Sequence, residues 1–126
     1  MDAGVETVTE GIISPERYAA WRQSALGATT ETLELALVFG LAGQVAGQKV
    51  LDAGTGDGTY AIEAASRGAR VVGVDTEAAM LGAADRRARH RGLEIEWREG
   101  RVESLPFDDG TFDLVLAVTV LCFADA

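Results

Sequence analysis

A short apolar run that ends in three alternating glycines constrains this chain more than any other feature. The run begins at Lys49, the glycines stand at positions 54, 56 and 58, and an alanine-rich helical pattern follows at once. A strand that turns into a helix through glycines brings backbone N–H groups to the mouth of a parallel sheet, where α/β folds bind ligands. The sequence therefore predicts a ligand site in this loop.

Two details of the loop favour a cationic ligand over a dinucleotide. Its spacing is G-x-G-x-G, and Thr59 stands where the dinucleotide pattern G-x-G-x-x-G needs glycine. Asp52 ends the strand, and a carboxylate there would repel a pyrophosphate but suits an ammonium or a sulfonium. A second apolar strand ends in Asp75, about 20 residues beyond the glycines, where such folds place the acid that binds ribose hydroxyls. These features indicate a nucleoside joined to a cationic amino-acid moiety.

The segment from Val50 to Phe123 resembles the class I S-adenosylmethionine-dependent methyltransferases, in particular the small-molecule type found in quinone biosynthesis. The motifs that carry the resemblance are VLDAGTGDG at 50–58, VVGVDT at 71–76, DTEAAML at 75–81 and GRVESLPFDDGTFD at 100–113. The resemblance implies S-adenosyl-L-methionine as the cofactor and a small molecule as the methyl acceptor. It implies no metal and identifies no catalytic base.

The cofactor-binding residues that the resemblance implies lie mostly at strand ends and in the loops that follow them: Tyr18, Asp52, Gly54, Thr55, Gly56, Asp75, Thr76, Met80, Arg101, Val102 and Ala117. Asp52 would hold the ammonium group, Gly54 to Gly56 the methionine backbone, and Asp75 the ribose diol. Met80 and Val102 would frame the adenine, and Ala117 would lie near the amino-acid end.

Three of these residues leave alternatives open. Tyr18, with Trp21, is similar to an N-terminal segment that covers the cofactor in the family, but the two rings also suit a surface helix. Met80 equally suits a core position. Arg101 stands where the family has an acid that accepts a hydrogen bond from adenine, and a guanidinium cannot accept one.

The pattern predicts an α/β fold with a parallel sheet, and the resemblance implies a Rossmann-like doubly wound sheet with strand order 3-2-1-4. Strands are expected from Lys49 and over 69–74, 94–99 and 111–120, with crossover helices over 59–67 and 76–91. A helix capped by Ser14 should end at Gly27, and Thr29 or Thr30 should cap the next. Residues 1–47 are expected to form an arm and helices that cover the cofactor site, and residues 48–126 a partial S-adenosylmethionine-binding core.

The complete family sheet has the order 3-2-1-4-5-7-6, so the C-terminal half of the fold is expected to be missing here. The fourth strand would then form an open edge. A homodimer, or further C-terminal polypeptide, is expected to cover it.

Composition narrows the partners and the location. The net charge of -9 argues against nucleic acid, because phosphate binding depends on Lys and Arg. Cys122 is the single cysteine, so no internal disulfide can form. Without a basic-then-apolar leader or an apolar run of membrane length, we expect a cytoplasmic protein with no membrane partner.

Two rival functions share the strand–glycine–helix–acid plan. One is half of an NAD-dependent oxidoreductase domain, which the glycine spacing and Asp52 disfavour. The other is a non-catalytic fragment that binds the cofactor without turning it over.

Overall fold

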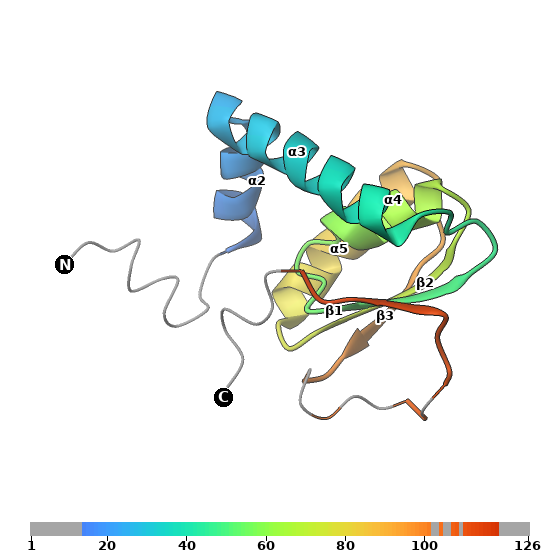
Figure 1. Cartoon of the computed structure of the whole chain (residues 1–126). Coiled ribbons are helices and arrows are strands. Elements are labelled where there is room, and N and C mark those ends of the chain that lie inside the picture. The colour runs from blue at the N-terminus through green and yellow to red at the C-terminus, as the bar shows by residue number, and fades with distance from the viewer. Residues whose placement is uncertain (1–13, 102–103, 105–106, 109, 119–126) are drawn as a thin grey trace.

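A four-stranded parallel sheet forms the centre of the chain, with the order β3-β2-β1-β4 (Figure 1). The computed structural model describes residues 14–101, 104, 107–108 and 110–118. The strands are β1 Lys49–Ala53, β2 Arg70–Asp75, β3 Glu96–Glu99 and β4 Leu114–Leu116. All neighbouring pairs are parallel, so the predicted Rossmann-like order 3-2-1-4 is confirmed.

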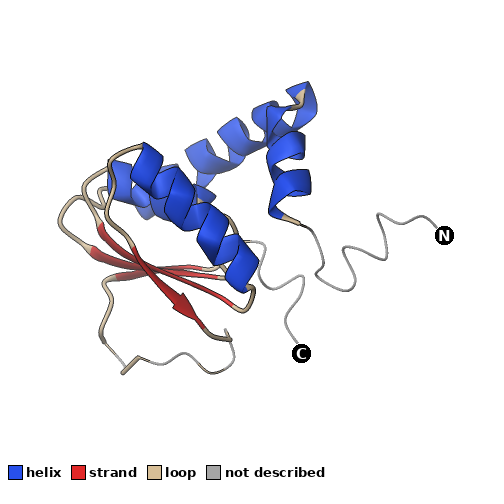
Figure 2. Ribbon diagram, turned by 180° about the vertical axis from the view of Figure 1, so that it is seen from behind, coloured by secondary structure: helices blue, strands red, loops and turns tan. Residues whose placement is uncertain are grey.

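Four helices accompany the sheet: α2 Pro15–Gln23, α3 Ala25–Ala42, α4 Thr59–Ser66 and α5 Ala78–His90. Figure 2 shows α3, α4 and α5 on one side of the strands. Parallel strands need such crossover helices, and α4 and α5 connect β1 to β2 and β2 to β3 as the sequence predicts. Asp113 sets the start of β4, because its carboxylate accepts from the N–H of Lys49 at 2.8 Å.

The first two described helices meet at one serine, not at the expected glycine. Ser14 caps α2 as predicted, but Ser24 is both the C-cap of α2 and the N-cap of α3. Its hydroxyl donates to the carbonyl of Trp21 at 2.6 Å and accepts from the N–H of Gly27 at 3.0 Å. The expected boundaries at Gly27 and at Thr29 or Thr30 are therefore wrong. Gly27 lies in the first turn of α3, where a Cβ would lie 1.8 Å from the Trp21 carbonyl oxygen.

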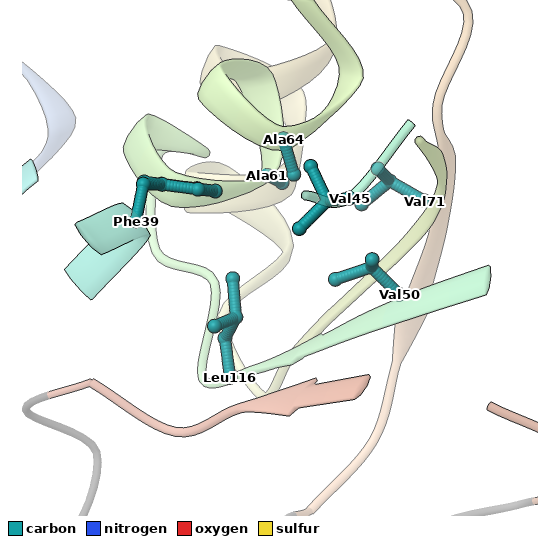
Figure 3. Packing of buried hydrophobic residues seen from close by; sticks show 7 residues of the cluster. All are labelled: Phe39, Val45, Val50, Ala61, Ala64, Val71 and Leu116. Carbon is teal, nitrogen blue, oxygen red and sulfur yellow. The ribbon is translucent and has the colours of Figure 1, made fainter. Parts of the chain in front are cut away.

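The hydrophobic core lies between the sheet and the helices that cover it (Figure 3). Its buried members come from α3, the α3–β1 connection, three strands and α4: Phe39, Val45, Val50, Ala61, Ala64, Val71 and Leu116. Phe39 is 3% exposed and carries the Arg67 guanidinium 4.6 Å from its ring centroid. Part of the segment before residue 48 thus packs into the same core as the sheet, while its predicted role as a cover over the cofactor stays a prediction.

Trp97 of β3 packs over β2 and uses the space that two glycines leave. It stands beside Gly73 in the register of the two strands. A Cβ on Gly73 would lie 2.6 Å from two carbons of the indole ring, and one on Gly58 would lie 3.0 Å from Cη2. The absent side chains of these glycines are therefore replaced by one large ring, which joins β3 to the start of α4.

Helix α3 is unusually apolar for its exposure. Leu33, Leu37 and Leu41 are 66%, 64% and 82% exposed. Its 18 residues have a mean hydropathy of 1.3, so by length and composition alone this helix could cross a membrane. That is weak evidence for a span, since one such helix near the N-terminus also occurs in proteins that do not span a membrane.

The packing of Trp97 leads to a stability prediction. We expect Gly73→Ala to lower the free energy of unfolding by about 1–3 kcal/mol, because the new methyl group must displace the indole ring. Gly40→Ala is the matched control, since no atom lies within 4 Å of a Cβ there and alanine favours the helix. Urea unfolding of the three proteins measures the difference. Equal stability of Gly73→Ala and the wild type would contradict the packing role of Gly73.

Candidate cofactor site

The carboxyl ends of the parallel strands bring the predicted residues to one edge of the sheet. The loop from Gly54 to Gly58 follows β1, Asp75 ends β2, Arg101 follows β3 and Ala117 follows β4. The N–H of Gly100 donates to the backbone carbonyl of Asp75 at 3.0 Å, which fixes the loop after β3 against the end of β2. This edge is where open α/β sheets bind their ligands.

The glycine loop is held by its own hydrogen bonds. Gly54, Gly56 and Gly58 have φ angles of 74°, 58° and 90°, a left-handed region that favours glycine. The N–H groups of Gly54 and Thr55 both donate to the Val74 carbonyl at 2.8 Å, and that of Gly58 donates to Thr55 at 2.9 Å. The N–H of Gly56 donates to Asp75. These four donors are engaged within the protein, and the role expected of Gly54 to Gly56 in holding the methionine backbone stays a prediction.

The glycines differ in what surrounds them. A Cβ on Gly56 would meet no atom within 4 Å, whereas one on Gly58 would meet Ala84 and Trp97 at 3.0 Å. Gly56 therefore borders open space. A glycine is needed at position 58 because Ala84 and Trp97 pack against it, which the glycine spacing alone does not indicate.

Asp75 is oriented by two backbone donors. Its Oδ2 accepts from the N–H of Gly56 at 2.8 Å, and its Oδ1 accepts from that of Glu77 at 2.9 Å. A carboxylate has about four acceptor positions, so two remain for further donors. The half-buried carboxylate thus has the capacity to accept ribose hydroxyls beside the open space at Gly56.

Asp52 lies beneath the loop. It is 2% exposed, and its Oδ2 accepts from the Thr55 hydroxyl at 2.7 Å, so both predicted side chains are engaged with each other. Burial raises the pKa of Asp52 to about 7, although hydrogen bonds from Thr55 and the Ala61 backbone act in the opposite direction. Nearby Asp75 also raises the pKa of Asp52.

A buried ion-pair cluster surrounds Asp57, a residue that the sequence analysis did not select. Asp57 is 3% exposed and pairs with Arg22 of α2 through Oδ2. Its Oδ1 lies 3.1 Å from Nη1 of Arg87 in α5. No spacing rule links positions 22, 57 and 87 in the sequence.

Two tyrosines and a glutamate extend the cluster toward α3. The Tyr60 hydroxyl donates to Oε1 of Glu34 at 3.3 Å, and burial raises the pKa of Tyr60. Burial, followed by the negative charges of Asp57, Glu31 and Glu34, raises the pKa of Tyr18. Tyr18 is half-buried and lies edge-to-face with Trp21 at 5.9 Å. Since Asp57 acts on Tyr18, this ring lies near the glycine loop.

The remaining predicted residues occupy varied positions. Met80 is 8% exposed and belongs to the core, which agrees with the structural alternative left open for it. Thr76, Arg101 and Ala117 are exposed at the strand-end edge, and Val102 lies outside the described residues. Within the described part of the chain, no group of three His, Cys, Asp or Glu residues could hold a metal ion.

The burial of Asp52 makes stability depend on pH. The carboxyl ionises near 3.8 in the unfolded chain, but the pKa of Asp52 is about 7 in the folded chain. Between these values the folded state keeps a proton that the unfolded state has lost, so the free energy of unfolding falls as pH rises. We expect Asp52→Asn to gain stability relative to the wild type from pH 4.5 to 7.5, on the order of 3 kcal/mol.

Urea unfolding at the two pH values measures this gain. Glu77→Gln, which changes an exposed acid nearby, is the control and should leave the pH dependence unchanged. A difference between Asp52→Asn and the wild type that does not vary with pH would contradict the assignment.

Comparisons with known proteins are consistent with a methyltransferase domain. The model of the methyltransferase domain family matches residues 50–126, more than half of the chain. Demethylmenaquinone methyltransferase of Thermus thermophilus is 43% identical over 88 residues, which cover 68% of this chain and 40% of that protein. The chain spans 28% to 40% of the length of the curated relatives it matches.

Solved structures show the same fold. The YcgJ protein of Bacillus subtilis matches this chain with a TM-score of 0.63 and 33% identity. The match covers 67% of this chain and 36% of the YcgJ chain. A second match is phosphoethanolamine N-methyltransferase 1 of Haemonchus contortus, solved with phosphoethanolamine and S-adenosylhomocysteine. Its TM-score is 0.72, and the match covers 98% of this chain and 28% of the methyltransferase chain. At 18% identity the second likeness shows the fold alone. This chain belongs to the methyltransferase domain family, and its cofactor is S-adenosylmethionine.

Proposed function

We propose that this chain provides the cofactor-binding part of an enzyme that transfers a methyl group from S-adenosylmethionine to a small molecule. The observation that carries the proposal is the inward hydrogen bonding of the glycine loop. Its N–H groups at 54, 55, 56 and 58 are used within the protein, while open space borders Gly56. A loop with its donors engaged is poorly suited to a pyrophosphate and well suited to a cationic amino-acid group.

The chain's own acids then have distinct roles. Asp75, oriented by Gly56 and Glu77, accepts the ribose hydroxyls. Asp52 acts through its charge from beneath the loop, because its carboxylate is buried and bonded to Thr55. A cation bound above it favours the ionised carboxylate, so binding near pH 6 is expected to release a proton.

The chemistry asks the protein mainly for alignment. S-adenosylmethionine supplies a methyl group on a sulfonium, which a nucleophile of the acceptor displaces in line. Holding two reactants in that geometry accounts for a large part of the rate enhancement in such reactions. We propose that Ala117, after β4, and Tyr18, on α2, border the place where the acceptor meets the cofactor. The small-molecule class of acceptor and a cytoplasmic location remain predictions.

One rival function differs from the proposed function in its ligand, and the other differs in its activity. Half of an NAD-dependent oxidoreductase domain needs loop donors for the pyrophosphate, and here the four donors at 54–56 and 58 are engaged. A non-catalytic fragment would bind S-adenosylmethionine without methyl transfer, so an activity assay separates it from an enzyme.

Calorimetry tests the ribose role of Asp75. We expect the chain to bind S-adenosylhomocysteine in preference to NAD, and Asp75→Ala to weaken that binding. Each charge-assisted hydrogen bond lost is worth on the order of 1.5–3 kcal/mol, so the loss should exceed about tenfold. Glu94→Ala removes an exposed acid that lies before β3, outside the strand-end edge, and should leave the affinity unchanged. An unchanged affinity in Asp75→Ala would remove this residue from the ribose site.

A second prediction concerns the edge of the sheet. In the described residues β4 pairs only with β1, and Val115 is 53% exposed. We propose that further polypeptide, or a second copy of this chain, covers β4, as an open strand edge readily pairs with another chain. The predicted contribution of Val120–Phe123 lies outside the described residues.

Light scattering of residues 1–126 alone should therefore show a dimer or larger assembly without methyl transfer activity. Val115→Lys should shift the assembly toward the monomer, because a charge blunts the edge. Leu37→Lys, on the exposed side of α3, should not. A monomeric wild type with a sharp unfolding transition would contradict the proposal.

A further inference from the structure

Helix α2 has little apolar packing to hold it in place. None of its nine residues is buried, and Trp21 is 40% exposed. Figure 1 shows the helix at the N-terminal end of α3, on the side of the sheet where the strands end. Hydrophobic burial is the usual reason that a helix stays docked, so another interaction has to fix α2 against the core.

Arg22 supplies that interaction. Its Nη1 donates to Oδ2 of Asp57, and the Arg22 side chain is 14% exposed. Its guanidinium lies 5.6 Å from the centroid of the Tyr18 ring, one turn earlier on the same helix. The arginine thus joins α2, and the ring that α2 carries, to the glycine loop.

Arg87 holds the same carboxylate from α5. Its Nη1 lies 3.1 Å from Oδ1 of Asp57 and donates to the Asp57 carbonyl at 2.9 Å and to the Thr59 hydroxyl at 3.2 Å. Asp57 is therefore fixed from two helices. It stands between Gly56, which borders the open space, and Gly58, which packs against Trp97.

We propose that Arg22 is a positioning residue that couples the docking of α2 to cofactor binding through Asp57. The inference rests on the function proposed above. Asp57 directly follows Gly56 in the chain, and the Gly56 N–H holds the Asp75 carboxylate, so a shift of Asp57 would be passed to the proposed ribose site. Docking of α2 and binding of the cofactor therefore strengthen each other by the same factor, since coupling between two sites is reciprocal.

Arg22→Ala is the direct test. Arg87 still neutralises Asp57 in this variant, so no buried charge is left unpaired and the fold should be retained. Arg89→Ala is the matched control. It also removes an arginine from an ion pair, but Arg89 is 78% exposed and its partner Asp85 lies on the same helix. Arg22→Lys keeps the charge without the planar fork and should restore part of the function.

Two measurements on the full chain report the coupling. We expect Arg22→Ala to raise the Kd for S-adenosylhomocysteine by about 5- to 100-fold, the usual range for coupled sites, with Arg89→Ala within about twofold of the wild type. Hydrogen exchange should show that S-adenosylhomocysteine protects the α2 amides in the wild type and in Arg89→Ala. Arg22→Ala should lose this protection while β1 and β2 keep theirs.

The results separate failure of this inference from failure of the proposed function. An Arg22→Ala variant that binds as tightly as the wild type, or a wild type in which the ligand leaves α2 unprotected, would overturn the coupling. A wild type that binds no S-adenosylhomocysteine would overturn the proposed function. In that case exchange without ligand still decides the role of Arg22, because α2 should exchange faster in Arg22→Ala than in Arg89→Ala.

Discussion

The hydrogen bonds between the glycine loop and the end of β2 are the constraint on which the rest of the site depends. The Val74 carbonyl accepts from two successive N–H groups, and the Asp75 carboxylate accepts from a third. These bonds force the loop into conformations that favour glycine and leave Gly56 beside open space. The same bonds aim the Asp75 carboxylate, so the loop and the acid form one unit.

The packing of Trp97 depends on the conformation of the same glycine loop. Gly58 cannot carry a side chain in its left-handed conformation without strain, and the room it leaves is filled by Trp97. Trp97 in turn needs a glycine beside it in β2, at position 73. The Trp97 ring of β3 thus packs against the end of the glycine loop at Gly58 as well as against β2.

Sequence patterns were sufficient for the parts that depend on short-range rules. The apolar runs, the glycine spacing and the two strand-end acids predicted the parallel strands and their crossover helices, and the family resemblance implied the strand order that the structure shows. The Arg22–Asp57–Arg87 cluster was missed because its members are far apart in sequence and meet only after folding. The start of α3 was misplaced at Thr29 or Thr30 because Ser24 serves two helices as a cap.

The serine that both helices share makes α2 a lever. With one residue between the helices, α2 can move as a unit only by turning about the φ and ψ angles of Ser24. The nine residues of α2 give an arm of about 13 Å, so a small rotation at Ser24 displaces Tyr18 by several times the movement near the axis. In such a motion α2 would move as a folded helix, so closing the site would not cost the backbone entropy of forming that helix.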